Sequence, residues 1–282
     1  MRLTKTSLTL LSGAVFGVLA ANLFRPVAAD APKAFAREEP IYRSLDANLA
    51  VQTSAEYRAC CLQAYNLATC RLNEKLAGDP KFPNRPAVIL DLDETVFDNS
   101  GFQAVMARSG LTFDQRLFDW WEDSQGAEVE LVPGALDFIQ AAKAKKVEIC
   151  YITNRRNHTK TMDVLVRLGL EVPADQLKVN TEKKSSNKQK RRDEVAEKFT
   201  VVMLVGDNLR DFDEVFKFPD PELMVPAAKS IPARAEAVDK NKAKFGVDWI
   251  ILPNPMYGEW MKPFGHGTAD LDFLRPVRVP KD

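Results

Sequence analysis

Apolar runs of strand length alternate with helix-like segments along this chain of 282 residues. The runs occupy residues 87–92, 147–153, 176–180, 200–205 and 249–252. Segments with helical spacing or helical end signals lie between them, at residues 135–145, 158–168, 187–198 and 211–216. Strands that are apolar along their whole length and alternate with helices are typical of a parallel sheet covered on both faces. The sequence therefore predicts an α/β fold with a doubly wound, Rossmann-like parallel sheet.

The chain divides into a leading part, residues 30–86, and a core, residues 87–282. The leading part begins with residues 30–47, which are rich in Ala, Pro and charge and are expected to form a flexible lead-in. Apolar residues at three- and four-residue spacing then predict one helix over 54–76. Within the core, the irregular, aromatic-rich stretch at about 98–132 predicts a helical insertion, which would form a small helical accessory domain beside the sheet.

Residues 1–29 have the pattern of a secretory signal peptide, with a basic start, an uncharged apolar stretch over 6–24 and small residues before a cut after Ala29. The alternative is an uncleaved membrane anchor, because an apolar run of this length nearly spans a bilayer. Either interpretation predicts an exported protein, periplasmic or extracellular, with membrane contact only through an uncleaved N-terminus. No cysteine precedes Cys60, so the pattern excludes a lipid-modified cysteine near the cut.

The four cysteines do not form an obvious disulfide framework. Cys60, Cys61 and Cys70 lie on the helix predicted over 54–76, where a rise of about 1.5 Å per residue separates Cys60 from Cys70 by about 15 Å. That separation is beyond disulfide reach, and Cys150 belongs to a strand that should be buried. Buried free thiols are the expectation, with long-range pairing as the alternative.

Composition excludes several classes of protein. The 39 basic and 39 acidic residues balance, so no global field attracts a nucleic acid polymer. The only histidines, His158 and His266, cannot form a three-histidine zinc centre, and they offer little for a haem site.

Acidic residues cluster where the first predicted strand ends. Asp91 and Asp93 are two residues apart, so an extended chain directs both side chains to the same side. In open α/β sheets, ligands bind in the cleft beyond the carboxyl ends of the strands. Taken alone, such a cluster is more often a solvated turn or a helix cap.

Further polar residues follow the other predicted strands. Thr153 and Asn154 end the second strand, and Asp207 and Asp211 follow the fourth. A polar helix start that carries Lys188 lies between them. In a doubly wound sheet these strand ends meet at one edge, so the sequence predicts one composite site.

This ordered set of motifs resembles the haloacid dehalogenase superfamily. A narrower likeness, over about residues 48–262, is to the secreted bacterial class C acid phosphatases of the acid phosphatase B family, some of which are 5′-nucleotidases. It rests on Asp-Leu-Asp-Glu-Thr at 91–95, Thr-Asn-Arg at 153–155, Gly-Asp-Asn-Leu-Arg-Asp-Phe at 206–212 and Pro-Asn-Pro-Met-Tyr-Gly-Glu-Trp at 253–260. The resemblance implies a hydrolase with a haloacid dehalogenase-like core that cleaves small phosphomonoesters.

The resemblance also implies catalytic and metal-binding roles. Asp91 would be the nucleophile that forms an aspartyl-phosphate, since a carboxylate is ionised at neutral pH. Asp93 would act as general acid and then activate water. A Mg²⁺ ion would be held by Asp91, Asp207 and the backbone carbonyl of Asp93, because oxygen ligands suit this ion. Asp211 would support the ion indirectly, from beyond its direct ligands or through water.

For the phosphate, the resemblance implies binding by Thr153, Asn154 and Lys188, with Lys184 as the alternative lysine. It further implies that Tyr257, Trp260 and Phe102 stack on the base of a nucleoside 5′-monophosphate. These rings can instead simply pack the domain, and residues 101–105 lack a tryptophan expected in some nucleotidases. A phosphotransferase on the same scaffold and a non-catalytic storage or binding relative are the alternative functions. The oligomeric state is left open.

Overall fold

The computed structural model describes residues 44–264, except 79, 112, 125–128, 183–184 and 218–226. The expected leader or anchor at 1–29, the lead-in up to residue 43, Lys184 and His266 lie outside the described residues. Among the helices of the described part, none is long and apolar enough to cross a membrane.

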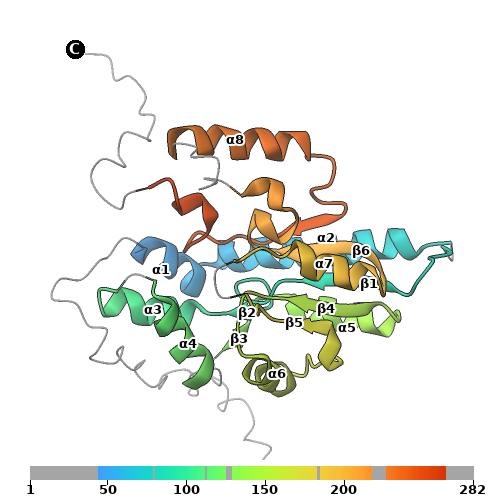
Figure 1. The fold of residues 1–282 in the computed structure, drawn as a ribbon, viewed down its shortest axis with the longest axis horizontal. Coiled ribbons are helices and arrows are strands. Elements are labelled where there is room, and N and C mark those ends of the chain that lie inside the picture. The colour runs from blue at the N-terminus through green and yellow to red at the C-terminus, as the bar shows by residue number, and fades with distance from the viewer. Residues whose placement is uncertain are drawn as a thin grey trace, which may run out of the picture.

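A parallel sheet forms the centre of the molecule, as Figure 1 shows. Its strand order is β5-β4-β1-β6-β7, and every neighbouring pair is parallel. The strands are β1 (Pro86–Leu90), β4 (Glu148–Ile152), β5 (Leu177–Lys178), β6 (Thr200–Gly206) and β7 (Trp249–Ile251). Each strand lies where an apolar run predicts one, so the α/β prediction with a doubly wound parallel sheet is confirmed.

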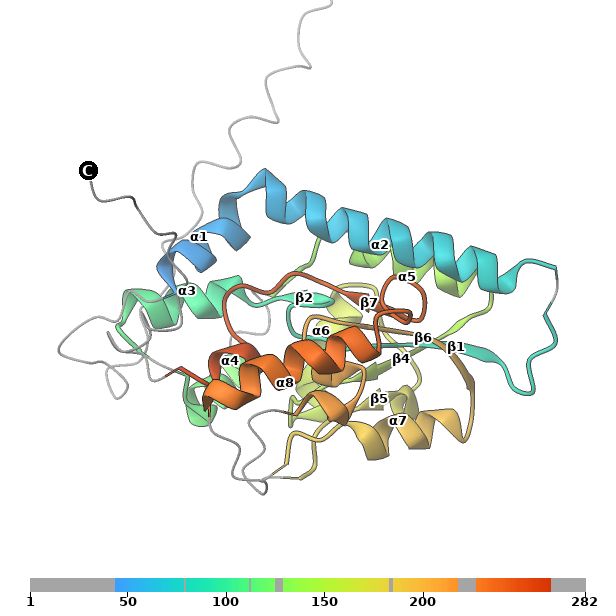
Figure 2. The ribbon, with the colours of Figure 1, turned by 90° about the horizontal axis from the view of Figure 1, so that it is seen from above.

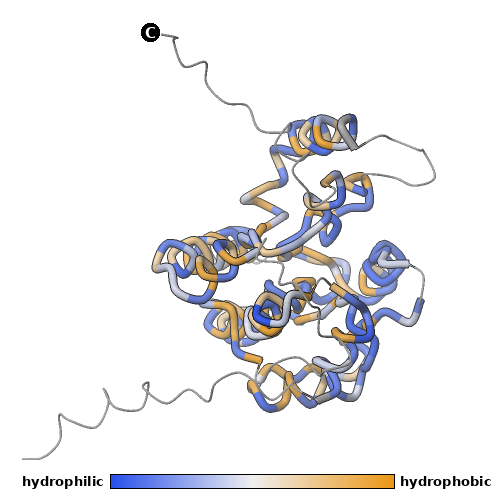
Figure 3. Tube along the Cα trace, turned by 90° about the vertical axis from the view of Figure 1, so that its left-hand side faces the viewer, coloured by the Kyte–Doolittle hydropathy of each residue, from blue (hydrophilic) through white to orange (hydrophobic). Residues whose placement is uncertain are grey.

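Alternating side chains of the central strands feed two separate apolar cores. Val88 and Leu90 of β1 belong to the larger core, which α2 (Ala55–Leu76) and α5 (Ala135–Ala144) cover. Ala87 and Ile89 face the opposite side and meet Val195 of α7 (Gln189–Ala196). Figure 2 shows α2 and α7 on opposite sides of the sheet. In Figure 3, apolar and polar stretches alternate along the helices, as expected where one side of each helix is buried.

The helix α6 (His158–Arg167) joins β4 to β5 and has end signals that the sequence carries. The Asn157 side chain caps its start by accepting a hydrogen bond from the amide of Lys160 at 3.1 Å. Gly169 follows its end with a φ of +70°, the left-handed conformation that favours glycine. The short helix η3 (Ala174–Gln176) then leads into β5.

Between β1 and α5, the chain leaves the sheet and forms two helices, α3 (Ser100–Arg108) and α4 (Gln115–Ser124). The two-residue strands β2 (Phe97–Asp98) and β3 (Glu130–Leu131) pair antiparallel at the base of this excursion. The helices fall within the stretch expected to be a helical insertion, whereas the small strand pair was not expected. This pairing holds the two ends of the helical segment, at β2 and β3, close together.

Three details differ from the sequence predictions. Helix α1 (Leu45–Thr53) begins inside the stretch expected to be a flexible lead-in. Helix α8 (Ala227–Lys240) was not predicted; it contains Pro232, a residue that normally interrupts helices, and lies at the outer edge of the molecule in Figure 1. Residues 211–216 are not one helix but parts of two 3₁₀ turns, η4 (Leu209–Asp211) and η5 (Glu214–Phe216).

The cysteines are all free thiols, as expected. Cys61 and Cys150 are buried, but Cys60 and Cys70 are exposed, so the expectation of burial is wrong for these two. Consecutive helical residues point about 100° apart, so Cys60 and Cys61 cannot both face the core. No disulfide joins any of the four.

Candidate active site

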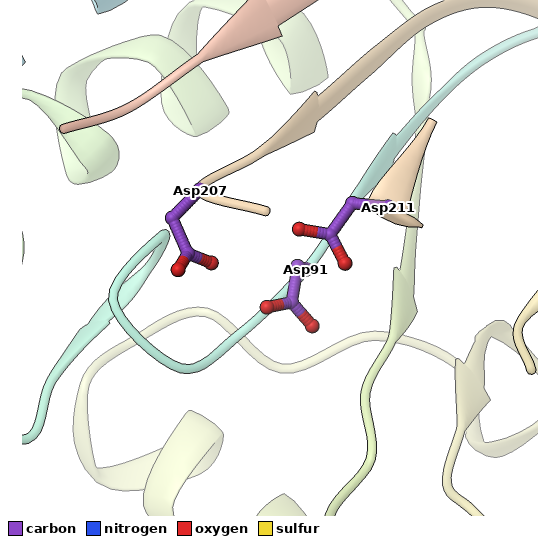
Figure 4. A group of neighbouring side chains, drawn as sticks. All are labelled: Asp91, Asp207 and Asp211. Atoms are coloured by element: carbon purple, nitrogen blue, oxygen red, sulfur yellow. The ribbon is translucent and has the colours of Figure 1, made fainter. Parts of the chain in front are cut away.

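Three carboxylates meet at the carboxyl ends of β1 and β6. Asp91 directly follows β1, Asp207 directly follows β6, and Asp211 ends the turn η4. One carboxylate oxygen from each lies within 4.8 Å of the others. Figure 4 shows the three side chains gathered from these separate segments. The sheet therefore brings together the acidic residues that the sequence placed at two strand ends.

The turn after β6 is built to deliver Asp211 back to Asp207. The Asp211 carboxylate accepts a hydrogen bond from the Asn208 amide at 2.9 Å, and the Asn208 side chain accepts one from the Arg210 amide at 3.2 Å. Gly206 makes room for this arrangement, because a Cβ atom there would lie 2.4 Å from the Cβ of Asp211. Glycine at this position follows from the close approach of the Asp211 side chain.

Lys188 lies between two of the acids. Its ammonium contacts Asp91 Oδ1 at 2.5 Å and Asp211 Oδ1 at 2.6 Å, and the residue is buried. Burial lowers the pKa of Lys188, but the carboxylates of Asp211 and Asp91 outweigh it and raise that pKa above its ordinary value. The lysine is therefore a fixed positive charge beside Asp91.

One ammonium does not balance three carboxylates in a buried site. Burial raises the pKa of Asp91 well above its usual range, although the Lys188 charge opposes the change. Burial and the neighbouring Asp211 raise the pKa of Asp207 to about 7. Such crowded oxygen ligands fit a divalent cation, which would relieve the repulsion.

Asp207 is held by two further side chains. Thr95 donates to Oδ1 at 3.2 Å, and the Asn254 amide donates to Oδ2 at 2.8 Å. Asn254 comes from the segment after β7, nearly fifty positions along the chain, and sequence reasoning gave it no role although its motif was recognised. Its only sequence signal is its place in the Pro-Asn-Pro stretch.

Asp93 has different partners from Asp91. Its Oδ1 accepts hydrogen bonds from Arg155 Nε and Asn99 Nδ2, both at 2.8 Å, and its Oδ2 accepts one from Thr153 Oγ1 at 3.4 Å. Thr153, expected to bind phosphate, is fully buried and also accepts from the Arg155 amide at 3.1 Å. Asn99 and Arg155 were not expected to act at this site, although Arg155 lies inside the Thr-Asn-Arg motif at 153–155.

A cavity of about 270 Å³ opens over these groups. Its polar wall includes Asp91, Asp93, Lys188 and Asp207, and the exposed Asn154 also lines it. Asn154 is held from behind, since its side-chain oxygen accepts a hydrogen bond from Arg191 at 2.9 Å. The cavity therefore joins the acidic cluster to the expected phosphate-binding residues other than Thr153.

The other wall of this cavity is aromatic. Phe102, Phe113, Phe118 and Tyr257 line it. Phe102 is fully buried, and its ring meets Phe118 edge to face at 5.5 Å, so it supports the wall from within the insertion. Trp260 lines a separate, larger cavity of about 590 Å³, and Tyr257 lies on the boundary between the two.

Arg210 ties the lysine segment to the segment that carries Tyr257. Its guanidinium donates to Ser186 at 2.7 Å, to Glu259 at 2.9 Å and to Glu214 at 2.7 Å. Glu214 in turn accepts the backbone amide of Lys188 at 2.8 Å. This partly buried network fixes the position from which Lys188 reaches Asp91.

The chain is similar to known phosphatases over this whole region. The model of a family described as HAD superfamily, subfamily IIIB (acid phosphatase), matches residues 38–260. The solved structure of a class C acid phosphatase from Bacillus anthracis shares 33% sequence identity, with a TM-score of 0.70 over 84% of this chain and 98% of that one. The structure of a class C acid phosphatase from the same organism with tungstate bound gives a TM-score of 0.69 at the same identity and coverage.

Proposed function

The chain belongs to subfamily IIIB of the HAD superfamily, the acid phosphatases, and is a phosphomonoester hydrolase; from this premise we propose that Asp91 is its nucleophile. The observation that carries the proposal is the position of Asp91 at the end of β1, in the wall of the cavity and 2.5 Å from Lys188. The Lys188 ammonium opposes the rise that burial causes in the pKa of Asp91, so it favours the ionised carboxylate, which attacks phosphorus without a separate base.

In the first step an Asp91 oxygen forms a bond to phosphorus while the bond from phosphorus to the leaving-group oxygen breaks. Asp93 gives its proton to that leaving oxygen, so an alcohol departs. In the second step Asp93 takes a proton from water as the water oxygen attacks phosphorus. The bond between phosphorus and Asp91 then breaks, which releases inorganic phosphate and restores both carboxyl groups.

Lys188, Asn154 and Thr153 are proposed to hold the phosphoryl oxygens. Lys188 supplies a buried positive charge next to Asp91. This charge would stabilise the phosphoryl oxygens, where negative charge accumulates during transfer to Asp91. Asn154 lines the cavity directly. The Thr153 hydroxyl instead contacts Asp93, so Thr153 can bind phosphate only if this hydroxyl turns toward the substrate. The tungstate-bound relative binds an oxyanion, which agrees with a phosphate site in this family.

A divalent ion, Mg²⁺, is proposed as the cofactor. Phosphatases of this superfamily generally use a divalent metal, and the three clustered carboxylates fit such an ion. The ligands would be Asp91, Asp207 and the Asp93 carbonyl, with Asp211 acting through water. When bound, the ion neutralises charge on the phosphoryl oxygens.

The aromatic wall supports a substrate with a flat leaving group, and a nucleoside 5′-monophosphate is the proposed class. Tyr257 lines the same cavity as Asp91, so a base could stack on it while the phosphate reaches the acids, whereas Phe102 is fully buried and supports the wall without an exposed face for a base. Trp260 lies outside this cavity, and its predicted stacking role would require contact from the neighbouring one. Export to the periplasm or medium remains part of the proposal, in keeping with the N-terminal sequence pattern.

A phosphate-release panel tests these proposals. Nucleotides, sugar phosphates and an aryl phosphate are assayed with Mg²⁺, with chelator and with Asp91→Asn. The substitution is expected to lower kcat by about 10⁴-fold or more, and the chelator is expected to stop turnover until Mg²⁺ is restored. Asp163→Asn, which changes an exposed aspartate of α6, is the matched control and should retain activity. Phosphate release that survives both treatments would overturn the mechanism.

Two variations of the panel address the finer proposals. Tyr257→Ala should weaken the binding of nucleotides by about 1–3 kcal/mol, the usual contribution of one stacked base. The binding of a small alkyl phosphate should be unchanged. Equal effects on both substrates would remove the stacking role. The phosphotransferase alternative is tested by adding glycerol and analysing products, since transfer would form glycerol phosphate at the expense of inorganic phosphate.

A further inference from the structure

Two side chains hold one oxygen of the Asp93 carboxylate. Arg155 Nε and Asn99 Nδ2 both donate to Oδ1, each at 2.8 Å. The second oxygen, Oδ2, has a weaker contact, a 3.4 Å hydrogen bond from Thr153. Because Asp93 lines the substrate cavity, this arrangement fixes the carboxylate through Oδ1 and leaves Oδ2 as the oxygen that can exchange a proton.

Arg155 is built into the protein interior rather than attached to its surface. Its side chain is 0% exposed, against 15% for Asp93. Its guanidinium lies over the rings of Phe97 at 5.0 Å and Phe118 at 5.6 Å from the ring centroids. Burying a guanidinium is costly unless its charge is paired. The paired carboxylate here is Asp93, while Nη1 of Arg155 has no hydrogen-bond partner in the part of the chain that the structure describes.

Asn99 locks the two partners together. Its side-chain oxygen accepts a hydrogen bond from Arg155 at 3.0 Å and another from the Trp121 indole at 3.0 Å. Its side-chain nitrogen is therefore directed at Asp93, and an amide flip would lose both of these bonds. The orientation of the Asp93 carboxylate is thus set by residues from two separate segments, one after β4 and one before α3.

We infer that Arg155, together with Asn99, is a positioning residue that orients Asp93 so that Oδ2 faces the leaving-group oxygen of the substrate. This inference rests on the proposed function, in which Asp93 protonates that oxygen. Both residues act by holding Asp93. Phe118, which lines the cavity and also packs on Arg155, connects this positioning to the wall that the leaving group contacts.

The dependence on leaving group distinguishes positioning from a merely structural role. A nitrophenolate leaves readily as an anion, whereas an alkoxide requires the proton that Asp93 supplies. Arg155→Met should therefore lower kcat/KM for an alkyl phosphate, such as glycerol phosphate, by about 10²-fold more than for p-nitrophenyl phosphate. kcat/KM is the right quantity because it reports the steps up to departure of the leaving group. A loss that is equal for the two substrates, or no loss, would overturn the inference.

The matched control is Arg156→Met, which changes the next arginine, an exposed residue. This control should not alter the ratio of the kcat/KM values for the alkyl and nitrophenyl substrates. Asn99→Ser provides a second route in case Arg155→Met fails to fold, because it keeps the buried ion pair and removes one of the two donors to Asp93. It should show the same selective loss, and an unchanged ratio would count against the inference. Arg155→Lys should restore only part of the alkyl activity, because a single ammonium cannot reproduce the fork that bridges Asp93 and Asn99.

Asp93→Asn, measured in parallel, separates failure of this inference from failure of the proposed function. If Asp93→Asn selectively loses the alkyl substrate and the Arg155 and Asn99 variants do not, positioning is wrong and the role of Asp93 stands. If Asp93→Asn itself affects both substrates equally, the proposed general acid is wrong and the inference falls with it. Selective loss in all three variants supports both.

Discussion

Replacing Gly206 with alanine tests how the acidic site is assembled. The new Cβ would lie 2.4 Å from Cβ, 2.5 Å from Oδ2 and 2.8 Å from Cγ of Asp211. Atoms at these separations overlap, so either the backbone of the turn or the Asp211 side chain must move. The residue that moves carries both the hydrogen bond from the Asn208 amide and the ion pair with Lys188.

The expected loss of stability follows from these contacts. Overpacking a buried site costs about 1–3 kcal/mol, and losing a capping interaction costs about 1 kcal/mol. Gly206→Ala should therefore lower the free energy of unfolding by about 2–4 kcal/mol, which corresponds to a fall in Tm of about 5–15 °C for a domain of this size. Displacing Asp211 should also weaken Mg²⁺ activation by about 10–100-fold, the usual effect of losing a group that supports a metal ligand.

Thermal unfolding by circular dichroism and a Mg²⁺ titration of activity measure the two effects. Gly101→Ala is the matched control, because a Cβ there would meet only Trp121 at 3.7 Å, an ordinary contact. Within helix α3 this alanine should be neutral or stabilising by up to about 1 kcal/mol. A Gly206→Ala protein with the Tm and Mg²⁺ dependence of the parent would refute the reasoning.

Three further changes are expected to have measurable results. A thiol reagent at pH 8 should label the two exposed cysteines of α2 quickly, but not Cys61 or Cys150, because both are buried and burial raises their pKa to about 11 and about 12; four fast-reacting thiols would contradict this. Tyr65→Phe should cost about 1–2 kcal/mol in chemical denaturation, because its hydroxyl donates at 2.6 Å to a buried backbone carbonyl after β1; an unchanged midpoint would contradict it. Burial opposes ionisation of Glu259, but its two ion pairs outweigh burial and lower its pKa below the ordinary value. The stabilisation from these ion pairs should be complete above the ordinary pKa of glutamate and should disappear as the pH falls through the lowered pKa of Glu259. Plots of Tm against pH for the parent and for Glu259→Gln should therefore converge at acid pH. Curves that stay parallel would exclude this linkage.

The strands could be predicted from sequence because burial on both faces requires continuous apolar runs. β1, whose residues are almost all buried, is the strongest example. The same logic fails for α1 and α8, since a helix packed at the periphery needs few apolar residues and carries a weak signal. Pro232 even favours a non-helical interpretation of α8.

The acidic part of the site could be anticipated because a parallel sheet brings strand ends to one edge, wherever they lie in the chain. The partners of Asp93 could not. Arg155 lies 62 positions away from it and Asn99 lies 6 away. No sequence spacing shows that both side chains meet the same carboxylate oxygen. The aromatic residues were similarly ambiguous, since packing and ligand contact require the same side chains. Trp260 lines only the larger cavity, whereas Tyr257 lines both.

Trapping the phosphorylated protein tests the central claim most directly. The enzyme is mixed with excess substrate and Mg²⁺, quenched in acid within milliseconds, digested and examined by mass spectrometry. The account predicts one phosphoryl group on the peptide that contains Asp91, absent from Asp91→Asn. With p-nitrophenyl phosphate as the substrate, it should accumulate in Asp93→Asn, where attack by water is slowed. A phosphoryl group on a different residue, or full turnover with none on Asp91, would contradict it.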